Sequence, residues 1–293
     1  MARLFNGTTQ YLETTTVPAV GPPVSFAAWI RPSSLAASAI IGVSRNSGTT
    51  QRAYLGLSAA GLITAISQSS GTTRTASTSA ATSASTWAHA CAVFASSTSR
   101  SVYLNGASKG TNTQNSSPTG LNRGNIGMVY AGTSASLFFP GDIAEVACWN
   151  VALTDGDAAL LAKGVSPYLV KGNNLLAYWP LVGRYSPEIS LFGGFDLTLT
   201  AAPTVSDHPP MRYAASPPKP QLRHIGVQTA VSMAAVAVGV SGLSYLLIPG
   251  PPPPPSEGGG GGTAALGGTG LGSTVQKSRL RWAQRRRRWP VRP

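Results

Sequence analysis

The stretch LFFPGDIAEVACWNVALTDGDAALL, which runs from Leu137 to Leu161, carries the clearest fold signal in the chain. Its first half is a mostly apolar run of strand character, and its second half has the marks of a short helix. Thr154 is placed as the N-cap, and Asp155 and Asp157 lie in the first turn, where their charges favour the helix dipole. Gly164 follows as the stop signal. The stretch therefore predicts a strand followed closely by a helix.

Hairpin patterns precede this stretch. The segment SVYLNGASKG (residues 101–110) alternates apolar and polar residues up to Asn105-Gly106. This dipeptide readily adopts positive φ and predicts a hairpin with a two-residue turn. The segment YLGLSAAGLITAIS (residues 54–67) predicts a second hairpin around a turn of small residues at 58–61.

An inner strand is predicted by SFAAWIRP (residues 25–32). Phe26 and Ile30 fall on one side of such a strand and Trp29 on the other, so both faces are covered. Pro32 ends the run because proline cannot donate to a sheet ladder. Strands at such close intervals are typical of an all-β sandwich rather than of βαβ units.

Taken in order, these blocks resemble the laminin-G-like, concanavalin-A-like jelly-roll family. The match includes the Trp-x-His strand TWAHACAVF (86–94), the Tyr-Leu-Asn-Gly hairpin, the Phe-x-Gly-x-Ile-x-Glu-Val strand and the Ala-Leu-Thr helix. It extends over residues 1–205, with LFNGTTQYLE (4–13) as the opening strand and NNLLAYWPLVG (173–183) and GGFDLTLT (193–200) as closing strands. The resemblance implies an antiparallel two-sheet jelly-roll sandwich that binds ligands rather than reacting with them.

Composition divides the chain into four parts. We expect a jelly-roll domain at 1–213, a proline-rich linker at 214–224, an apolar segment at 225–248 and a low-complexity, Arg-rich tail at 249–293. Residues 1–213 carry twelve basic and eight acidic residues, whereas the remainder carries ten basic and one acidic. The basicity of the chain therefore belongs to its C-terminal part and says little about what the sandwich binds.

The apolar segment Ile225 to Ile248 has 24 residues and no formal charge. At about 1.5 Å per helical residue it is long enough to cross a hydrocarbon core of about 30 Å. Three alternatives stay open: a membrane-spanning helix, a buried docking or oligomerisation segment, and a loosely structured linker. The chain enters a strand directly at its start, without the apolar region of a secretion signal.

The basic run Arg285–Arg288, flanked by Trp282 and Trp289, could contact an anionic polymer or lipid without specificity. A solvated terminal tail explains it as well. Sequence-specific nucleic-acid binding is not expected.

No catalytic pair is expected. Some relatives of this kind are glycoside hydrolases that use a Glu-x-Asp-x-x-Glu strand, in which two carboxylates flank the scissile bond. Here Asp142 and Glu145 keep the spacing, but Pro140 stands where the first Glu would be. The nucleophile is missing, so hydrolysis is the least favoured hypothesis and we expect a protein that is not an enzyme.

Calcium is the one cofactor that the resemblance suggests, since many such domains hold it through oxygens of surface loops. Asp142, Asp155 and Asp157 are the candidate ligands. Ala144 replaces an Asp that is frequent in the family just before Glu-Val, which argues against the site.

The histidines and cysteines suggest packing rather than chemistry. His89 lies within a predicted strand, and His208 and His224 lie in proline-rich or linker sequence, so a zinc site lacks ligands. Cys91 and Cys148 occur in two predicted strands and are expected to be free, buried thiols.

Three loop regions rich in Ser, Thr, Asn and Gln can hydrogen-bond to sugar hydroxyls: Arg45 to Arg52, Thr72 to Ser85, and Asn112 to Asn125. Four tryptophans stand in strand positions and are expected to pack in the sheets: Trp29, Trp87, Trp149 and Trp179.

The resemblance favours a structural or carbohydrate-binding protein at the surface of a tailed-bacteriophage virion, attached through its C-terminal tail. The ending YWPL…GRYSPEI…GGFDLTLT resembles that of domains found among such virion proteins, and a phage product needs no signal peptide because lysis releases it. The alternative is a membrane-anchored bacterial lectin-like protein with its sandwich outside the membrane and Ile225 to Ile248 as the anchor. Partners would be carbohydrate or a surface protein, and a homo-oligomer is compatible with the sequence.

Overall fold

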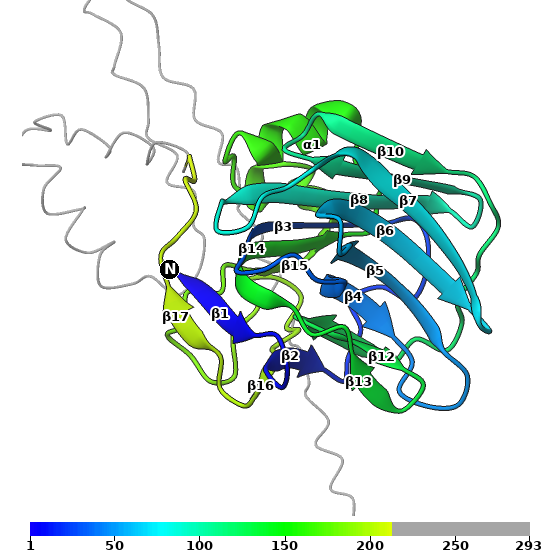
Figure 1. Cartoon of the computed structure of the whole chain (residues 1–293), viewed down its shortest axis with the longest axis horizontal. Helices are drawn as coiled ribbons and strands as arrows, with labels where there is room; N and C mark the ends of the chain where they lie inside the picture. Colours follow the sequence, from blue (N-terminus) through cyan, green and yellow to red (C-terminus); the bar gives the residue numbers. More distant parts are fainter. Residues whose placement is uncertain (213–293) are drawn as a thin grey trace, which may run out of the picture. The chain divides into compact units, whose positions relative to one another are not determined.

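A computed structural model describes residues 1–212, in which two antiparallel sheets pack against each other (Figure 1). Sheet A contains, in spatial order, β10 (Ser108–Asn112), β9 (Ser99–Leu104), β8 (Ala88–Ser96), β3 (Val24–Pro32), β14 (Pro140–Trp149), β1 (Ala2–Asn6) and β17 (Thr204–Ser206), with β15 (Leu175–Trp179) paired to the second half of β14. Sheet B contains β16 (Thr198–Thr200), β2 (Tyr11–Thr14), β11 (Arg123–Ile126), β4 (Ser38–Ser44), β5 (Gln51–Leu57), β6 (Leu62–Ser69) and β7 (Thr72–Ala81). The predicted all-β sandwich is confirmed.

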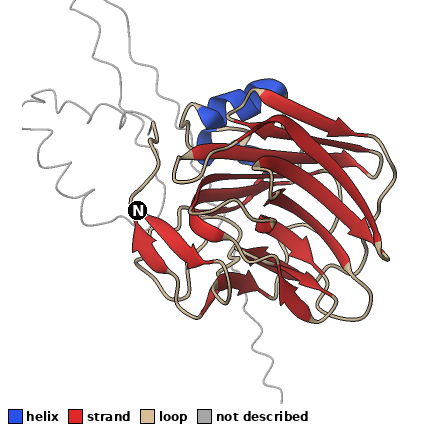
Figure 2. Cartoon of the chain, viewed as in Figure 1, coloured by secondary structure: helices blue, strands red, loops and turns tan. Residues whose placement is uncertain are grey.

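Short elements cover the outer faces of the two sheets. The hairpin of β12 (Val129–Ala131) and β13 (Ser134–Ser136) lies on sheet B, where Val129 packs with Tyr54. The helices, coloured blue in Figure 2, follow β14. They are α1 (Asp155–Ala162), η1 (Pro167–Leu169) and η2 (Gly172–Asn174). Leu161 of α1 packs with Trp149 and Tyr103 on the outer face of sheet A.

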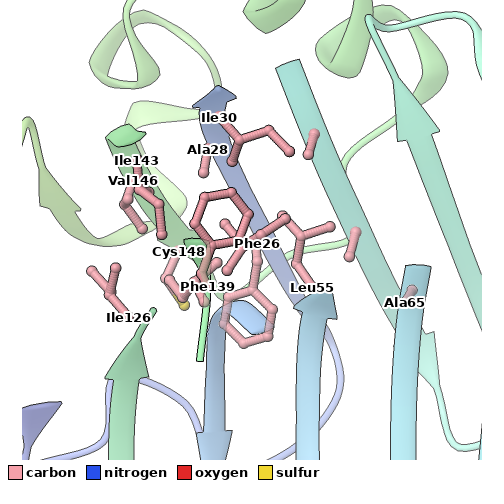
Figure 3. Packing of buried hydrophobic residues seen from close by; sticks show 14 of the residues in the cluster. Phe26, Ala28, Ile30, Leu55, Ala65, Ile126, Phe139, Ile143, Val146 and Cys148 are labelled. Atoms are coloured by element: carbon pink, nitrogen blue, oxygen red, sulfur yellow. The ribbon is translucent and has the colours of Figure 1, made fainter. Parts of the chain in front are cut away.

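The alternation along β3 determines how the sheets meet. Phe26, Ala28 and Ile30 are fully buried between the sheets, together with Leu55 of β5 (Figure 3). Trp29 packs on the opposite face of sheet A. Burial of a large apolar side chain is worth roughly 1.5–3 kcal/mol, so these contacts are a main source of the sandwich's stability. β8 and β14 flank β3, which is therefore the inner strand predicted from the sequence.

A bulge interrupts β14. Ile143 and Val146 both point into the core although they are three positions apart, because the register with β3 shifts between Ala144 and Ala147. Glu145 takes the extra position with a φ of 53°. Such left-handed backbone is uncommon for residues with a side chain. The bulge turns Glu145 away from the core.

The first and last strands of the described chain are fastened together. Arg3 of β1 forms an ion pair with Glu188, with 2.7 Å between Nη2 and Oε2, and both side chains are buried. Arg3 also donates to the carbonyl oxygens of Tyr185 and Pro203, each at 2.9 Å. β17 pairs with β1, and β16, which lies within the predicted closing strand 193–200, pairs with β2 of the opening segment. β15, which lies within the other predicted closing strand, pairs with β14 instead.

One predicted turn differs in the structure. The hairpin of β9 and β10 is connected by three residues, Asn105 to Ala107, rather than by two. Both residues of the Asn-Gly pair have positive φ, and the extra residue donates its backbone N–H to the carbonyl of Leu104 at 3.1 Å. The helix prediction is confirmed, since Thr154 caps α1 and forms a capping box with Asp157.

The linker 214–224, the apolar segment 225–248 and the tail 249–293 lie outside the described residues. Within residues 1–212, none of the helices has the length and hydropathy needed to cross a membrane.

Candidate functional site

An open hollow lies at one end of the sandwich, where β3 ends and β14 begins. Its volume is about 280 Å³, and its lining consists of Arg31, Pro32, Ser33, Ser85 and Asp142. β3 stops here because Pro32 has no N–H for the ladder, and the chain then turns away. Two backbone hydrogen bonds hold the rim, from the N–H of Ser33 to the carbonyl of Pro140 and from that of Ser85 to the carbonyl of Pro32.

Arg31 and Asp142 form the charged part of the hollow. Nε of Arg31 donates to Oδ2 of Asp142 at 2.8 Å. The other carboxylate oxygen accepts a hydrogen bond from the hydroxyl of Ser206 in β17. The Asp142 side chain is 6% exposed and that of Arg31 is 28% exposed. The carboxylate is thus fixed from two sides, and the guanidinium is the more accessible partner.

Trp87 supports the guanidinium. Cζ of Arg31 lies 5.1 Å from the centroid of the indole ring, within the range of a cation–π contact. The indole is half-buried and packs against the cluster of Trp29 and Ala144 on the outer face of sheet A. Because one contact holds Nε and another holds the plane of the group, the orientation of Arg31 is set before any ligand arrives.

Several polar groups of the hollow are available to a ligand. The two Nη groups of Arg31 make no hydrogen bond to any part of residues 1–212, and neither do the hydroxyls of Ser33 and Ser85. Both serines are exposed. Guanidinium nitrogens donate, whereas hydroxyls both donate and accept. The hollow therefore offers the mixture of donors and acceptors that a neutral polyhydroxy ligand needs.

The three carboxylates proposed as calcium ligands lie in separate places. Asp142 belongs to the hollow and is paired there with an arginine. Asp155 accepts hydrogen bonds from Nζ of Lys109 at 2.8 Å and from the Tyr103 hydroxyl at 2.7 Å, and these partners hold the pKa of its carboxyl below the usual value. Asp157 caps α1. In the described part of the chain no three His, Cys, Asp or Glu side chains form a group that could hold a metal ion. As placed, these residues do not fit a calcium site, and calcium binding stays a prediction.

The two acidic residues with glycosidase spacing have different surroundings. Glu145 does not line the hollow. It is buried, accepts a hydrogen bond from the Tyr178 hydroxyl and lies 2.9 Å from Nε2 of His208. Asp142 is held by Arg31, as described above. Each carboxylate has partners of its own, and Pro140 occupies the position of the missing nucleophile.

His89 is a packed histidine of sheet A. Its ring lies 5.5 Å from that of Trp29, and it is fully buried. Burial lowers the pKa of His89 to about 3, so the ring is neutral at physiological pH. This agrees with the expectation of a histidine that packs at the sheet face.

Cys91 and Cys148 are free and buried, as predicted. β3 lies between their strands. Burial raises the pKa of both thiols, to about 12 for Cys91. Neither group is a nucleophile in the folded protein, because the thiolate is the reactive form.

The predicted sugar-binding loops divide between the two ends of the sandwich. Arg45 to Arg52 and Asn112 to Asn125 meet at the end away from the hollow, where the backbone N–H of Asn46 donates to Oδ1 of Asn122 at 3.0 Å. The prediction of a loop at Thr72 to Ser85 was wrong, because residues 72–81 pair with β6 as the strand β7, and only Ser85 of this range lines the hollow.

Sequence reasoning missed Arg31 as a site residue and treated Trp87 as a packing residue. Trp29, Trp149 and Trp179 are buried as expected, whereas Trp87 carries the guanidinium on its ring. The sequence did offer one signal for Arg31, which is a charged residue directly before the proline that ends an apolar strand. The sequence could not show that Arg31 pairs with Asp142, because this contact depends on the order of the strands in the sheet.

The comparison with family models supports the fold assignment. A model described as the concanavalin A-like lectin/glucanases superfamily matches residues 6–159, which is more than half of the chain. The matched range includes every residue that lines the hollow. A search of curated proteins found no match.

Three solved structures with a similar fold illustrate the range of the matches. A proposed carbohydrate-binding protein from Bacteroides ovatus is 18% identical with a TM-score of 0.51, over 72% of this chain and 61% of that one. A SAP-like pentraxin from Limulus polyphemus is 17% identical with a TM-score of 0.46, over 55% and 81%. The CBM40 domain of Ruminococcus gnavus IT-sialidase, bound to α2,3 sialyllactose, is 14% identical with a TM-score of 0.48, over 55% and 94%. The chain thus spans less than two thirds of the Bacteroides protein.

Proposed function

Because the chain belongs to the concanavalin A-like lectin/glucanases superfamily, we propose that it is a non-catalytic carbohydrate-binding protein of a bacteriophage virion surface. A sugar residue of a glycan binds in the hollow at Arg31 and Asp142. The C-terminal part, residues 214–293, attaches the domain to the particle. The observation that carries the proposal is the open hollow, in which a fixed guanidinium and two hydroxyls have unused hydrogen-bonding capacity.

The chemistry of the hollow fits a sugar. Two neighbouring hydroxyls of a pyranose ring can accept from the Nη groups of Arg31, whose orientation Asp142 fixes. Ser33 and Ser85 supply further partners at the rim. A site that fixes its polar groups in advance avoids part of the ordering cost of binding. The ion pair is therefore the recognition element.

A binding role is favoured over hydrolysis by the strand that would carry the catalytic acids. A retaining glycosidase needs two carboxyl groups about 5–5.5 Å apart on either side of the bond that breaks. In this chain the nucleophile position is Pro140, and Glu145 is buried against Tyr178 and His208. The remaining carboxylate, Asp142, is neutralised by Arg31.

The virion location rests on the ending of the domain. The run from Tyr178 to Thr200 resembles the ending of stand-alone laminin-G-like domains in tailed-phage virion proteins. Part of this run forms β15 and β16, which complete the two sheets.

Glycan binding is tested with the full chain on a glycan array, with calcium and with chelator. The substitution Ser33→Tyr fills the hollow without altering the Arg31–Asp142 pair, and Ser99→Tyr places the same side chain at an exposed position of the opposite end. We expect saturable binding that Ser33→Tyr removes and Ser99→Tyr keeps, with the melting temperature unchanged in both. If the Ser33→Tyr variant still binds glycan, the binding site does not lie in the hollow. If the wild type binds none of the glycans, the proposed lectin function is rejected. Loss of glycan binding in chelator would support the predicted calcium site.

Location is tested by fractionation. Mass spectrometry of purified phage particles should find the full chain in a fixed ratio to the coat protein, accessible to an antibody against residues 1–212. Recovery in the membrane fraction of bacteria, and not in particles, would replace the virion proposal by the membrane-anchored lectin-like alternative.

A further inference from the structure

The described chain ends in a segment that lies on the outer face of sheet A, and we call residues 207–212 the strap. The strap follows directly after β17, which is the edge strand of this sheet beside β1 (Figure 1). At its far end the backbone N–H of Arg212 donates to the carbonyl of Gly164, just after α1, at 2.6 Å. The strap belongs to no strand of either sheet, so it can leave the surface without disrupting their pairing.

His208 fastens the strap to the bulge in β14. Its Nε2 lies 2.9 Å from Oε1 of Glu145, whose side chain is 1% exposed. The other oxygen of this carboxylate accepts a hydrogen bond from the Tyr178 hydroxyl. A carboxylate that is removed from water needs such partners, because an uncompensated buried charge is costly. The buried Glu145 therefore favours the docked position of the strap.

Met211 gives the strap an apolar contact. It packs against the cluster of Trp29 and Ala144 on the outer face of sheet A. Trp87 packs against the same cluster, and its indole ring lies under the guanidinium of Arg31. One group of side chains therefore supports both the strap and the charged part of the hollow.

Ser206 links the start of the strap to the hollow. It is the last residue of β17, and its hydroxyl donates to Oδ1 of Asp142, whose Oδ2 accepts from Arg31. His208 follows two residues later and contacts Glu145, which lies three residues after Asp142 in β14. Two contacts that are two residues apart thus tie the end of β17 both to the hollow and to the bulge.

The strap fits closely at its far end. Gly164 has a φ of 81°, and a Cβ there would lie 2.7 Å from the carbonyl oxygen of Pro210 and 2.8 Å from the backbone nitrogen of Arg212. Pro209 and Pro210 have fixed φ, so the strap loses less conformational entropy on docking than an ordinary segment of its length. The docked position is therefore one defined state, which changes at single contacts can favour or disfavour.

We propose that the strap couples the hollow to the point where residues 213–293 begin. With the strap docked, Ser206 fixes Asp142, and Asp142 in turn orients Arg31 for a ligand. With the strap released, this support loosens and the affinity of the hollow for its ligand falls. Such coupling is reciprocal, so an occupied hollow holds the strap more firmly. Ser206 and His208 are the positioning residues of this link. Its effect on ligand binding rests on the proposed function, whereas the link between strap and hollow does not.

Trypsin digestion of the full chain tests the link without a ligand. Cleavage after Arg212 requires a released strap, whereas cleavage after Arg100, which is buried, requires global unfolding and serves as the reference. Mass spectrometry measures both rates. His208→Ala should raise the ratio of the two rates about tenfold, because it removes a hydrogen bond to a buried carboxylate. Met211→Ala leaves that carboxylate paired and should raise the ratio as well.

Asp142→Ala is the decisive variant, because it changes the hollow and not the strap. It removes the acceptor of the Ser206 hydroxyl, so we expect cleavage after Arg212 to rise at least about threefold relative to cleavage after Arg100. Asp207→Asn is the matched control, since it changes an exposed residue of the strap itself, and it should leave the ratio unchanged. An unchanged ratio in Asp142→Ala, or no rise in both His208→Ala and Met211→Ala, would overturn the proposal.

Glycan binding provides the second test. For a glycan that the wild type binds on the array, His208→Ala should weaken the affinity several-fold, whereas Asp207→Asn should keep it. The bound glycan should also slow cleavage after Arg212 in the wild type. Equal affinities of the wild type and His208→Ala would reject the coupling. If no glycan binds, the proposed function fails, and the trypsin ratio in Asp142→Ala still decides whether the link exists.

Discussion

Arg31 and Asp142, 111 positions apart in the chain, are direct partners on neighbouring antiparallel strands, with Nε of the arginine 2.8 Å from Oδ2 of the aspartate. Along the chain, β14 comes after every strand of sheet B except β16, yet in space it lies beside β3 in sheet A. The ion pair, and the hollow that it lines, exist only when this strand order is complete. Changes at either residue should therefore affect both stability and ligand binding.

Arg31→Gln is expected to lower the free energy of unfolding by about 2 kcal/mol. It leaves the buried carboxylate of Asp142 with only the Ser206 hydroxyl, and an uncompensated buried charge is costly. Urea denaturation measures the loss. The double variant with Asp142→Asn should lose less than the sum of the single variants, and the exposed change Arg184→Gln should stay within about 0.5 kcal/mol of the wild type. Additive losses would show that the pair contributes no coupling.

Glu188→Gln should cost about 3 kcal/mol, since it removes the charge that Arg3 faces inside the protein. Arg3 holds the segment from Tyr185 to Pro203 by two further hydrogen bonds. Limited proteolysis should therefore cut this segment faster in the variant than in the wild type. Asp207→Asn, at an exposed position in the same part of the chain, is the control. Equal cutting rates would mean that β16 and β17 hold the segment without the ion pair.

The strands and their faces could be predicted from the sequence because alternation is local. Phe26 and Trp29 were assigned to opposite sides of β3, and the structure places them there. Thr154 was assigned as the cap of α1 for the same reason, since a capping residue acts on the next few residues. The hairpin turn was wrong by one residue because Asn-Gly fits more than one loop length.

The alternation of apolar and polar residues predicts on which face of a sheet a side chain lies. It does not predict which residue of the adjacent strand lies beside it, so the site could not be predicted. Arg31 was seen only as the end of a strand, and nothing local indicates that Asp142 will lie beside it. His208 was assigned to proline-rich or linker sequence, yet the structure places it against Glu145, which a bulge in β14 turns away from the core.

Both cysteines should be unreactive toward a thiol reagent in the native protein and react fully in guanidinium chloride. Cys91 and Cys148 are completely buried, and burial raises the pKa of each thiol, so little thiolate forms. Ser99→Cys adds an exposed thiol to the same chain and should react at once as one equivalent. Reaction of two or more equivalents in the native wild type would contradict the buried positions.

His89 should make the stability of the protein depend on pH between about 3 and 6.5. Burial lowers its pKa in the folded state to about 3, below the value of about 6.5 for an unfolded histidine. In this window the unfolded state binds one more proton than the folded state, so the contribution of His89 is complete above pH 6.5 and is lost as the pH falls. From pH 7 to pH 5 this loss is about 2 kcal/mol.

The variant His89→Phe keeps an aromatic ring against Trp29 but cannot take up a proton, so its unfolding free energy should fall by about 2 kcal/mol less over the same range. Urea denaturation at the two pH values measures both losses, and equal losses in the two proteins would show that His89 is not buried in its neutral form.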